Sequence, residues 1–309
     1  MFMPMLFEIL VYPGLLFILV VSLMYSGILR KLAARMQNRL GPPIVQPVYD
    51  VIKWFSKESI VPDEARAGYN MWPVVGVVAA FVAGLMVPMG GAAVLDGAGG
   101  IILLIYFLAL SSAAVYMAGF SSSNPFGVMG AIRGITQMIA YEVPFIVSIL
   151  VPIIALMGLG GVDYLSVSAI NGFQVNNVWL IQLYPLAGVV FLLTLVGKIE
   201  MPPFHTPGAH QELVGGYSAE YSGAGLGMIE VVHIIKGFVV MGLAVALFLG
   251  GAGTLPVFIA KTFGFLVVLT VLRVVMARLR IDHILEFYWL LAIVAGVDLI
   301  RVILVPAGL

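Results

Sequence analysis

The sequence of 309 residues contains no cysteine. This absence excludes disulfides, thiolate-held iron–sulfur clusters and zinc–thiolate sites within the chain. Charged residues are also scarce, at 10% of the chain, and the 15 Lys and Arg balance the 15 Asp and Glu. A net charge of zero gives no electrostatic support for binding to nucleic acid.

Apolar residues dominate instead, at 62% of the chain with a mean hydropathy of +1.12. A soluble domain carries about 25% charged residues, because water must wet its surface. The composition therefore predicts an all-α integral membrane protein, with residues 1–309 forming a single polytopic domain. No Lys or Arg precedes the first apolar run, which is too long for a signal-peptide core, so we expect it to be a retained span.

A hydrocarbon core about 30 Å thick needs about 20 apolar residues per helix. Eight runs qualify, and they must be helices because a spanning segment has to satisfy its own backbone polar groups. The predicted spans are Phe7–Leu29, Trp72–Met89, Gly100–Phe120, Gln137–Leu159, Val178–Val196, Gly225–Leu249, Leu255–Val275 and Ile284–Val305.

The basic residues predict an orientation. Twelve of the fifteen Lys and Arg lie in or beside the loops after the first, third, fifth and seventh spans, at about 30–71, 121–136, 197–224 and 276–283, with Arg273 just before the last loop. The positive-inside rule makes these loops cytoplasmic and places both termini outside, in a multi-pass protein of the cell membrane.

The first of these loops contains a predicted interfacial helix. After the break at Gly41-Pro42-Pro43, apolar residues recur at helical spacing, at Val48, Val51, Ile52 and Phe55. A short amphipathic helix at the membrane surface fits this pattern. Two interpretations stay open: the helix only orders the loop, or it is a docking platform for a soluble partner.

Several ionisable residues fall inside predicted spans, where each costs at least about 2.5–3.5 kcal/mol at the helix centre. Asp298 and Arg301 are three residues apart, and we expect a structural ion pair. Glu142 and the row Glu230, His233 and Lys236, also spaced by three, instead indicate a titratable path for protons or ions.

The loop after the fifth span concentrates further charge. It holds the carboxylates of Glu200, Glu212 and Glu220 and the imidazoles of His205 and His210. No metal site is predicted, because the proline-broken spacing does not place two ligands on one helical face. The interwoven apolar residues favour a packed, re-entrant segment over a solvated linker.

Five sequence motifs resemble those of one family. They are Arg39-Leu40-Gly41-Pro42-Pro43 followed by Gln46-Pro47, Asp50, Lys53 and Lys57-Glu58; Gln137 with Tyr141-Glu142; Pro203-Phe204 with Gln211-Glu212; Glu220-Tyr221-Ser222-Gly223; and Ala277-Arg278-Leu279-Arg280 with Asp282. Nearly the whole chain resembles the ND1/NuoH-type membrane subunit shared by respiratory complex I and membrane-bound [NiFe] hydrogenases.

The resemblance implies a subunit with no redox centre of its own. Its cytoplasmic loops would dock a hydrophilic arm that holds the iron–sulfur clusters and, in the hydrogenases, a [NiFe] centre. Antiporter-like membrane subunits and lipid would be its other partners. The docking candidates are Arg39, Asp50, Lys53, Lys57, Glu58, Arg278, Arg280 and Asp282. The candidates for an ion path that couples electron transfer to proton or sodium translocation are Glu142, Glu200, Glu212, Glu220, Glu230, His233 and Lys236.

Departures from the complex I pattern favour the hydrogenase branch or a related sulfur-reducing complex. His205, Gly208 and His210 stand where quinone-linked members have an Asp and two Glu, and Lys198 replaces a further Glu. These changes argue against a quinone chamber. A quinone-binding subunit of complex I and, from a different class, a free-standing secondary transporter remain the alternatives.

Overall fold

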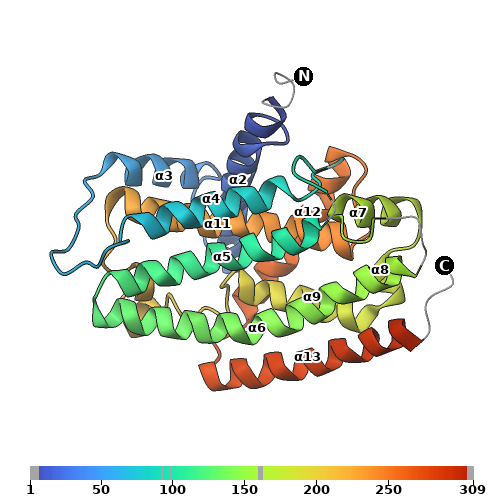
Figure 1. Cartoon of the computed structure of the whole chain (residues 1–309). Coiled ribbons are helices and arrows are strands. Elements are labelled where there is room, and N and C mark those ends of the chain that lie inside the picture. The colour runs from blue at the N-terminus through green and yellow to red at the C-terminus, as the bar shows by residue number, and fades with distance from the viewer. Residues whose placement is uncertain (1–6, 92, 98, 159–162, 305–309) are drawn as a thin grey trace.

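The computed structural model describes residues 7–91, 93–97, 99–158 and 163–304, and within these ranges its regular elements are all helical (Figure 1). Among these residues, six helical stretches are long and apolar enough to cross a membrane. They are Phe7–Met36, which contains α2 (Leu15–Met36), and α5 (Gly100–Ser121), α6 (Pro125–Met157), α11 (Gly223–Leu247), α12 (Leu255–Val275) and α13 (Ile281–Leu304). The all-α fold and its membrane-spanning character agree with the prediction.

Two further predicted spans correspond to shorter apolar helices, α4 (Met71–Leu85) and α9 (Pro185–Lys198). The fifth predicted span begins at Val178, but the structure divides it into α8 (Leu180–Leu183) and α9, with a separate helix, α7 (Val167–Asn176), before it. Pro185 is the reason for the last division, since proline lacks an N–H and is favoured in the first turn of a helix. The predicted ends at Leu159 and Val305 lie outside the described residues.

The helix α6 is 33 residues long, and it begins well before the predicted Gln137. Asn124 caps its N-terminus by accepting a hydrogen bond from the backbone N–H of Phe126 at 2.7 Å, and Pro125 occupies the first turn. At about 1.5 Å per residue the helix is about 50 Å long, against a hydrocarbon core of about 30 Å. The region predicted as the loop 121–136 is therefore largely helix.

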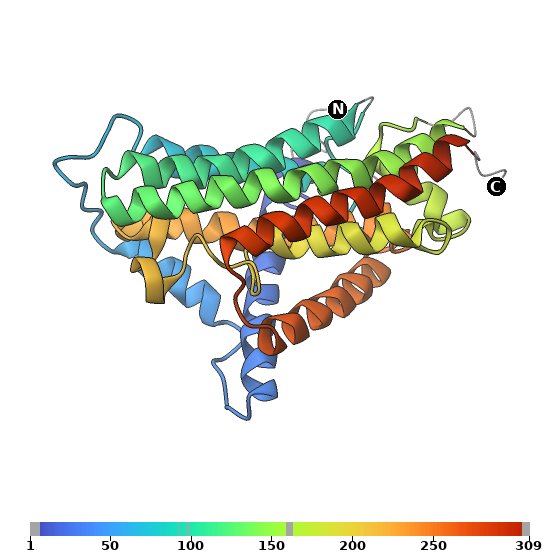
Figure 2. The same cartoon turned by 90° about the horizontal axis from the view of Figure 1, so that it is seen from below.

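Most long helices run side by side. The helix α6 packs against α5, α9 and α13, while α4 packs against α5 and α11. The helix α2 crosses the direction of these parallel helices. The helix α12 slopes away from them and packs against α2 (Figure 2). α3 (Gln46–Ser56) lies toward one end of the molecule, and α7 and α8 lie at the opposite end (Figure 1).

The central helix is α11, most of whose side chains are buried. It packs against α2, α3, α4, α7 and α12. A helix that is apolar on all sides belongs in the interior of a bundle. This position places Lys236 in the core, whereas Glu230 and His233 of the same helix are partly exposed.

The segment between α9 and α11 is packed against the bundle. It contains α10 (His210–Leu213) and the short 3-10 helix η1 (Gly216–Ser218), which lies against α5 and α6. A Cβ at Gly130 would come within 2.6 Å of the backbone nitrogen of Tyr217, so only glycine allows this close approach. The side chain of His210 lies outside what the structure describes.

The predicted amphipathic helix is α3, with a proline in its first turn. Pro47 is buried, whereas Ile52 and Phe55 are 61% and 51% exposed. The helix therefore presents apolar side chains on its outer surface as well as on the face toward α2 and α11.

Candidate functional site: a buried ion-pair network

The site is built around Glu200, which follows the C-terminus of α9. Its backbone is in the left-handed region, with φ of 58°. This conformation costs a residue with a Cβ about 1–3 kcal/mol and persists where surrounding contacts enforce it. In Glu200 those contacts are made by a carboxylate that is almost completely buried.

Two tyrosines and one lysine hold the Glu200 carboxylate. The hydroxyl of Tyr116 donates to Oε1 at 2.9 Å, and that of Tyr217 donates to Oε2 at 3.1 Å. The ammonium of Lys236 lies 3.2 Å from Oε1 and also donates to Ser112 at 3.2 Å. Burial is the largest single influence and raises the pKa of Glu200. The charge of Lys236, together with His233 and the hydrogen bonds from Tyr116 and Lys236, outweighs burial and lowers that pKa to about 2, so the carboxylate is ionised at neutral pH.

His233 extends this cluster toward the surface. Its Nε2 lies 3.0 Å from the hydroxyl of Tyr217, and its Nδ1 lies 3.9 Å from Oε1 of Glu200. Because the single hydroxyl proton of Tyr217 is donated to Glu200, Nε2 of His233 must carry the proton of their shared hydrogen bond. Burial, and next the charge of Glu200, raises the pKa of the Tyr217 phenol well above its usual value.

A second ion pair lies nearby on α6 and α9. The ammonium of Lys198 contacts Oε1 of Glu142 at 2.7 Å and lies 3.9 Å above the ring of Phe145. The Lys198 side chain is fully buried. The other carboxylate oxygen of Glu142 is buried without a hydrogen-bond partner among the described residues. Lys198 and Glu200 are only two residues apart, so the end of α9 contributes to both ion pairs.

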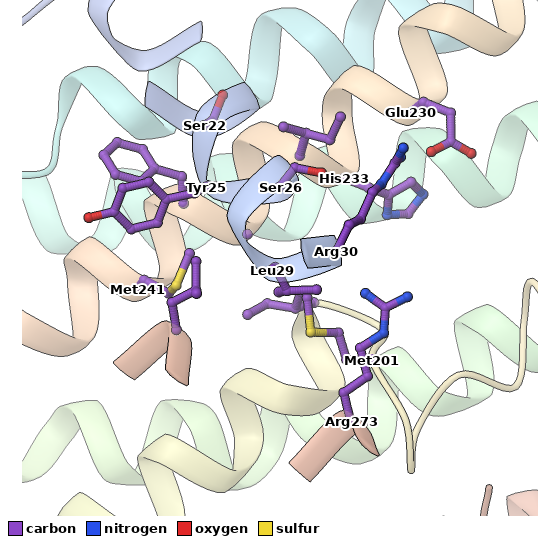
Figure 3. Close-up of a pocket in the computed structure, with 15 residues that line it drawn as sticks. Ser22, Tyr25, Ser26, Leu29, Arg30, Met201, Glu230, His233, Met241 and Arg273 are labelled. Carbon is purple, nitrogen blue, oxygen red and sulfur yellow. The ribbon is translucent and has the colours of Figure 1, made fainter. Parts of the chain in front are cut away.

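A pocket of about 200 Å³ lies next to the network, on the side of His233 (Figure 3). Arg30, Glu230 and His233 gather on one side of it, and Arg273 reaches it from α12 (Figure 3). Apolar side chains complete the walls, namely Tyr25, Leu29, Phe238, Met241 and Leu266. His233 lies in both the pocket wall and the Glu200 cluster, and so connects the two.

The structure thus brings together four of the predicted ion-path residues, Glu200 with His233 and Lys236, and Glu230 in the pocket beside His233. Glu142 lies in the second pair. Glu212 and Glu220 occupy other positions: Glu212 pairs with Arg133 at 2.5 Å near the surface, and Glu220 accepts a hydrogen bond from Asn124.

The predicted docking residues fall into three surface groups. Asp50 is paired with Arg30 at 2.7 Å, and the exposed Lys53, Lys57 and Glu58 follow it in and after α3. Arg39 lines a basic pocket of about 470 Å³ with Arg30 and Arg273. Arg278, Arg280 and Asp282 line a charged cleft of about 460 Å³ that also includes Arg133 and Glu212, and Arg280 pairs with Asp282 at 2.8 Å.

Asp298 and Arg301 do not form the expected ion pair in the described structure. Oδ2 of Asp298 accepts a hydrogen bond from the backbone N–H of Ala187 at 2.9 Å, and Arg301 donates to the carbonyl of Leu183 at 3.3 Å. The physical reason is the break before Pro185, which leaves free N–H groups at the start of α9 and a free carbonyl at the end of α8.

Sequence reasoning missed several members of the network. Lys198 was predicted to be a basic residue of a cytoplasmic loop and a departure from a family pattern, but its burial against the carboxylate of Glu142 was not predicted. Tyr116, Tyr217 and Ser112 carried no signal, since each stands among apolar or loop residues. Among the described residues, no group of three His, Asp or Glu side chains is placed to hold a metal ion.

Comparison with known proteins gives the family. The family model described as NADH dehydrogenase matches residues 9–305. This chain belongs to the NADH dehydrogenase family. The H-type subunit of one NADH-quinone oxidoreductase of Geobacter metallireducens is 34% identical over 286 residues, which cover 84% of each chain. The corresponding H-type subunit of Dehalococcoides mccartyi is 33% identical, and the match covers 91% of this chain and 82% of that relative.

A solved structure is also similar. A chain of the membrane-bound sulfane sulfur reductase, an archaeal respiratory membrane complex, matches with a TM-score of 0.85 and 27% identity over 97% of this chain and 98% of that chain. The resemblance inferred from the motifs is confirmed: this member of the NADH dehydrogenase family is a NuoH-type membrane subunit of complex I-related complexes.

Proposed function

We propose that the chain forms one membrane domain over residues 1–309 with eight spans, in which α4 and α9 complete the six longer ones. The helix α4 is 15 residues long, about 22 Å, and Met86, Val87 and Met89, which follow it in the sequence, are buried. The helix α9 is similarly preceded by α8. Packed extensions of this kind supply the length that a helix alone lacks.

The proposed orientation places both termini outside and the basic loops in the cytoplasm. The helix α3 then lies at the cytoplasmic membrane surface. Its exposed Ile52 and Phe55 support this position, because apolar side chains on a surface helix gain free energy by entering the interfacial region.

We propose further that the chain anchors a hydrophilic arm and couples its electron transfer to proton or sodium translocation. One observation carries the coupling role: the buried Glu200–Lys236 pair is connected through His233 to a pocket that contains Arg30, Glu230 and Arg273. A charge that changes in that pocket acts on His233, and through it on Glu200. The shared end of α9 then links Glu200 to the Glu142–Lys198 pair.

The arm would dock on the three surface groups that carry Arg39, Asp50 and Arg278. In this proposal the iron–sulfur clusters, and a [NiFe] centre where the complex is a hydrogenase, belong to partner subunits. Antiporter-like membrane subunits would continue the ion path. The charged cleft between α6 and the start of α13 supports docking, since it offers both signs of charge to a polar partner.

The proposal is tested by Glu200→Gln in the assembled complex, reconstituted into sealed vesicles. Electron transfer and ion uptake are measured separately on one preparation. We expect electron transfer to continue while ion uptake per electron falls, because the neutral amide no longer attracts Lys236. Asp163→Asn, an exposed change in the segment before α7, serves as the control. Unchanged ion uptake in Glu200→Gln would reject the coupling role.

A quinone-binding role is the second candidate, because the relatives with 30–34% identity are named subunits of NADH-quinone oxidoreductases. The pocket beside His233 has a suitable mixture of aromatic and polar walls. Its volume of about 200 Å³, however, is below the roughly 300–1,000 Å³ typical of small-molecule sites. Inhibition of electron transfer by a quinone analogue, relieved by His233→Ala, would favour this second role.

A further inference from the structure

A groove of about 450 Å³ lies between α9 and α12, away from the ion-pair network. Its walls are almost entirely apolar and include Leu192, Leu193, Phe265 and Val268. Both helices are apolar, and Val189 and Val268 are more than half exposed. The groove therefore opens toward the surface that faces lipid.

One end of the groove carries a single cation. The ammonium of Lys261 donates to the carbonyls of Gly250 at 3.0 Å and Gly251 at 2.7 Å, and lies 4.6 Å from the ring of Trp179. It forms no ion pair with any carboxylate of the described residues. A lysine within a span pairs either with an opposite charge or with backbone carbonyls, and the two carbonyls here supply no negative charge to neutralise the ammonium. A Trp in such a position is typical of the level of the lipid headgroups.

We propose that this groove binds one anionic phospholipid, with a hydrocarbon chain between α9 and α12 and the phosphate at Lys261. Two carbonyl acceptors use two of the three N–H donors of the ammonium, so one donor is left for a phosphate oxygen. The negative phosphate supplies the charge that the protein itself does not place beside Lys261. The apolar walls supply the chain site, since hydrocarbon is stabilised there by dispersion contacts with closely spaced side chains.

The groove offers a direct way to block the site without disturbing the fold. A Cβ added at Gly264, in the groove wall, would meet no atom within 4 Å. Gly264→Leu therefore fills the groove rather than the protein core. Gly296 on α13 is equally open and lies outside the groove, which makes Gly296→Leu a matched control.

The experiment measures phospholipid retained by the assembled complex. The complex is equilibrated in phosphatidylcholine nanodiscs that contain phosphatidylglycerol as a minor component, purified in detergent, and analysed by native mass spectrometry. We expect Lys261→Gln and Gly264→Leu each to retain one phosphatidylglycerol fewer than the unaltered chain. Lys261→Arg and Gly296→Leu should retain it, because they keep the cation and the open groove.

Equal retention of phosphatidylglycerol by Gly264→Leu and Gly296→Leu would overturn the proposal. A photo-reactive benzoylphenylalanine at Val268 gives a second measurement. A cross-linked adduct with the mass of phosphatidylglycerol supports the lipid, whereas an adduct with a partner subunit shows that a protein helix fills the groove and also overturns it. Neither measurement depends on ion translocation, so each can fail while the coupling role stands.

Discussion

The ammonium of Lys236 lies 3.2 Å from a carboxylate oxygen of Glu200, and neither side chain is more than 2% exposed. Removing two such charges from water costs several kcal/mol per ion, and their attraction and hydrogen bonds do little more than offset that cost. The pair therefore adds little to the free energy of unfolding. Its position, between the end of α9 and the middle of the central helix α11, suits a charge relay that responds to an adjacent pocket.

The first prediction concerns this pair. Lys236→Met should destabilise the complex by about 3–5 kcal/mol, because it leaves the Glu200 carboxylate buried without its counter-ion. The double variant Glu200→Gln with Lys236→Met should recover much of the loss, since neither charge then remains. Thermal denaturation of the purified complex measures both. A double variant that melts below Lys236→Met would show that the two side chains do not act as a pair.

The second prediction concerns the Glu142–Lys198 pair. Glu142→Gln should lower ion uptake per electron by about tenfold or more, as expected for the loss of a positioned group that transfers protons. Glu142→Asp keeps the charge and should retain a larger part of the uptake. Glu230→Gln, in the pocket, should act in the same direction as Glu142→Gln. If both glutamine variants pump as well as the unaltered complex, the ion path lies elsewhere.

The third prediction concerns pH and the attachment of α3. Burial raises the pKa of Asp50, but the hydrogen bonds from Gln46 and Arg30, together with the charge of Arg30, bring that pKa below its ordinary value. The folded pKa is thus below the unfolded value of about 3.9, so the stabilisation is fully present above about pH 4 and disappears as the pH falls further. The pair is partly exposed, so its contribution is small, about 0.2–1 kcal/mol.

Amide hydrogen exchange over residues 46–56 measures the attachment of α3. The protection conferred by the pair should be constant from about pH 5 to pH 7 and should fall below about pH 4. Asp50→Asn should lower the protection at neutral pH and abolish its acid dependence. An acid loss of protection that persists in Asp50→Asn would assign it to another carboxylate.

The positions of the helices could be predicted from the sequence better than the polar contacts between their side chains. The bounds of α12 were predicted as observed, at Leu255–Val275, because a loop rich in glycine and a basic segment frame the apolar run. The start of α6 was not predicted. An apolar run is interrupted by a charged residue such as Arg133, but the helix continues through that residue. The length of helix that crosses the hydrocarbon core and the total length of the helix are separate properties.

The members of the network were only partly predictable, because their contacts join distant parts of the chain. Glu200 and Lys236 are 36 residues apart, and Glu142 and Lys198 are 56 apart. A charged residue within or beside an apolar run can be recognised from the sequence. The oppositely charged residue with which it pairs cannot. The spacing of Asp298 and Arg301 even favoured the wrong partner, because unpaired backbone groups around Pro185 compete for the same side chains.

The last prediction concerns Gly197, which precedes Lys198 in α9. A Cβ at this position would come within 2.1 Å of the hydroxyl oxygen of Tyr288, a fully buried side chain of α13 that cannot swing into solvent. Gly197→Ala should therefore force α9 and α13 apart and cost about 1–3 kcal/mol, as overpacked cores do. Gly296→Ala adds its methyl group to open space and gains about 1 kcal/mol of helix propensity, so it should not lower the melting temperature.

A second-site change separates this steric effect from a general loss of flexibility. Tyr288→Phe removes the oxygen atom nearest to the added methyl group, so the double variant with Gly197→Ala should melt above Gly197→Ala alone. Ion uptake should follow the same order, because any shift of α9 at Gly197 also moves Lys198 relative to Glu142. A double variant with no recovery in either measurement would mean that the clash with Tyr288 is not the cause. Recovery of stability without recovery of ion uptake would instead place the Tyr288 hydroxyl in the proposed path.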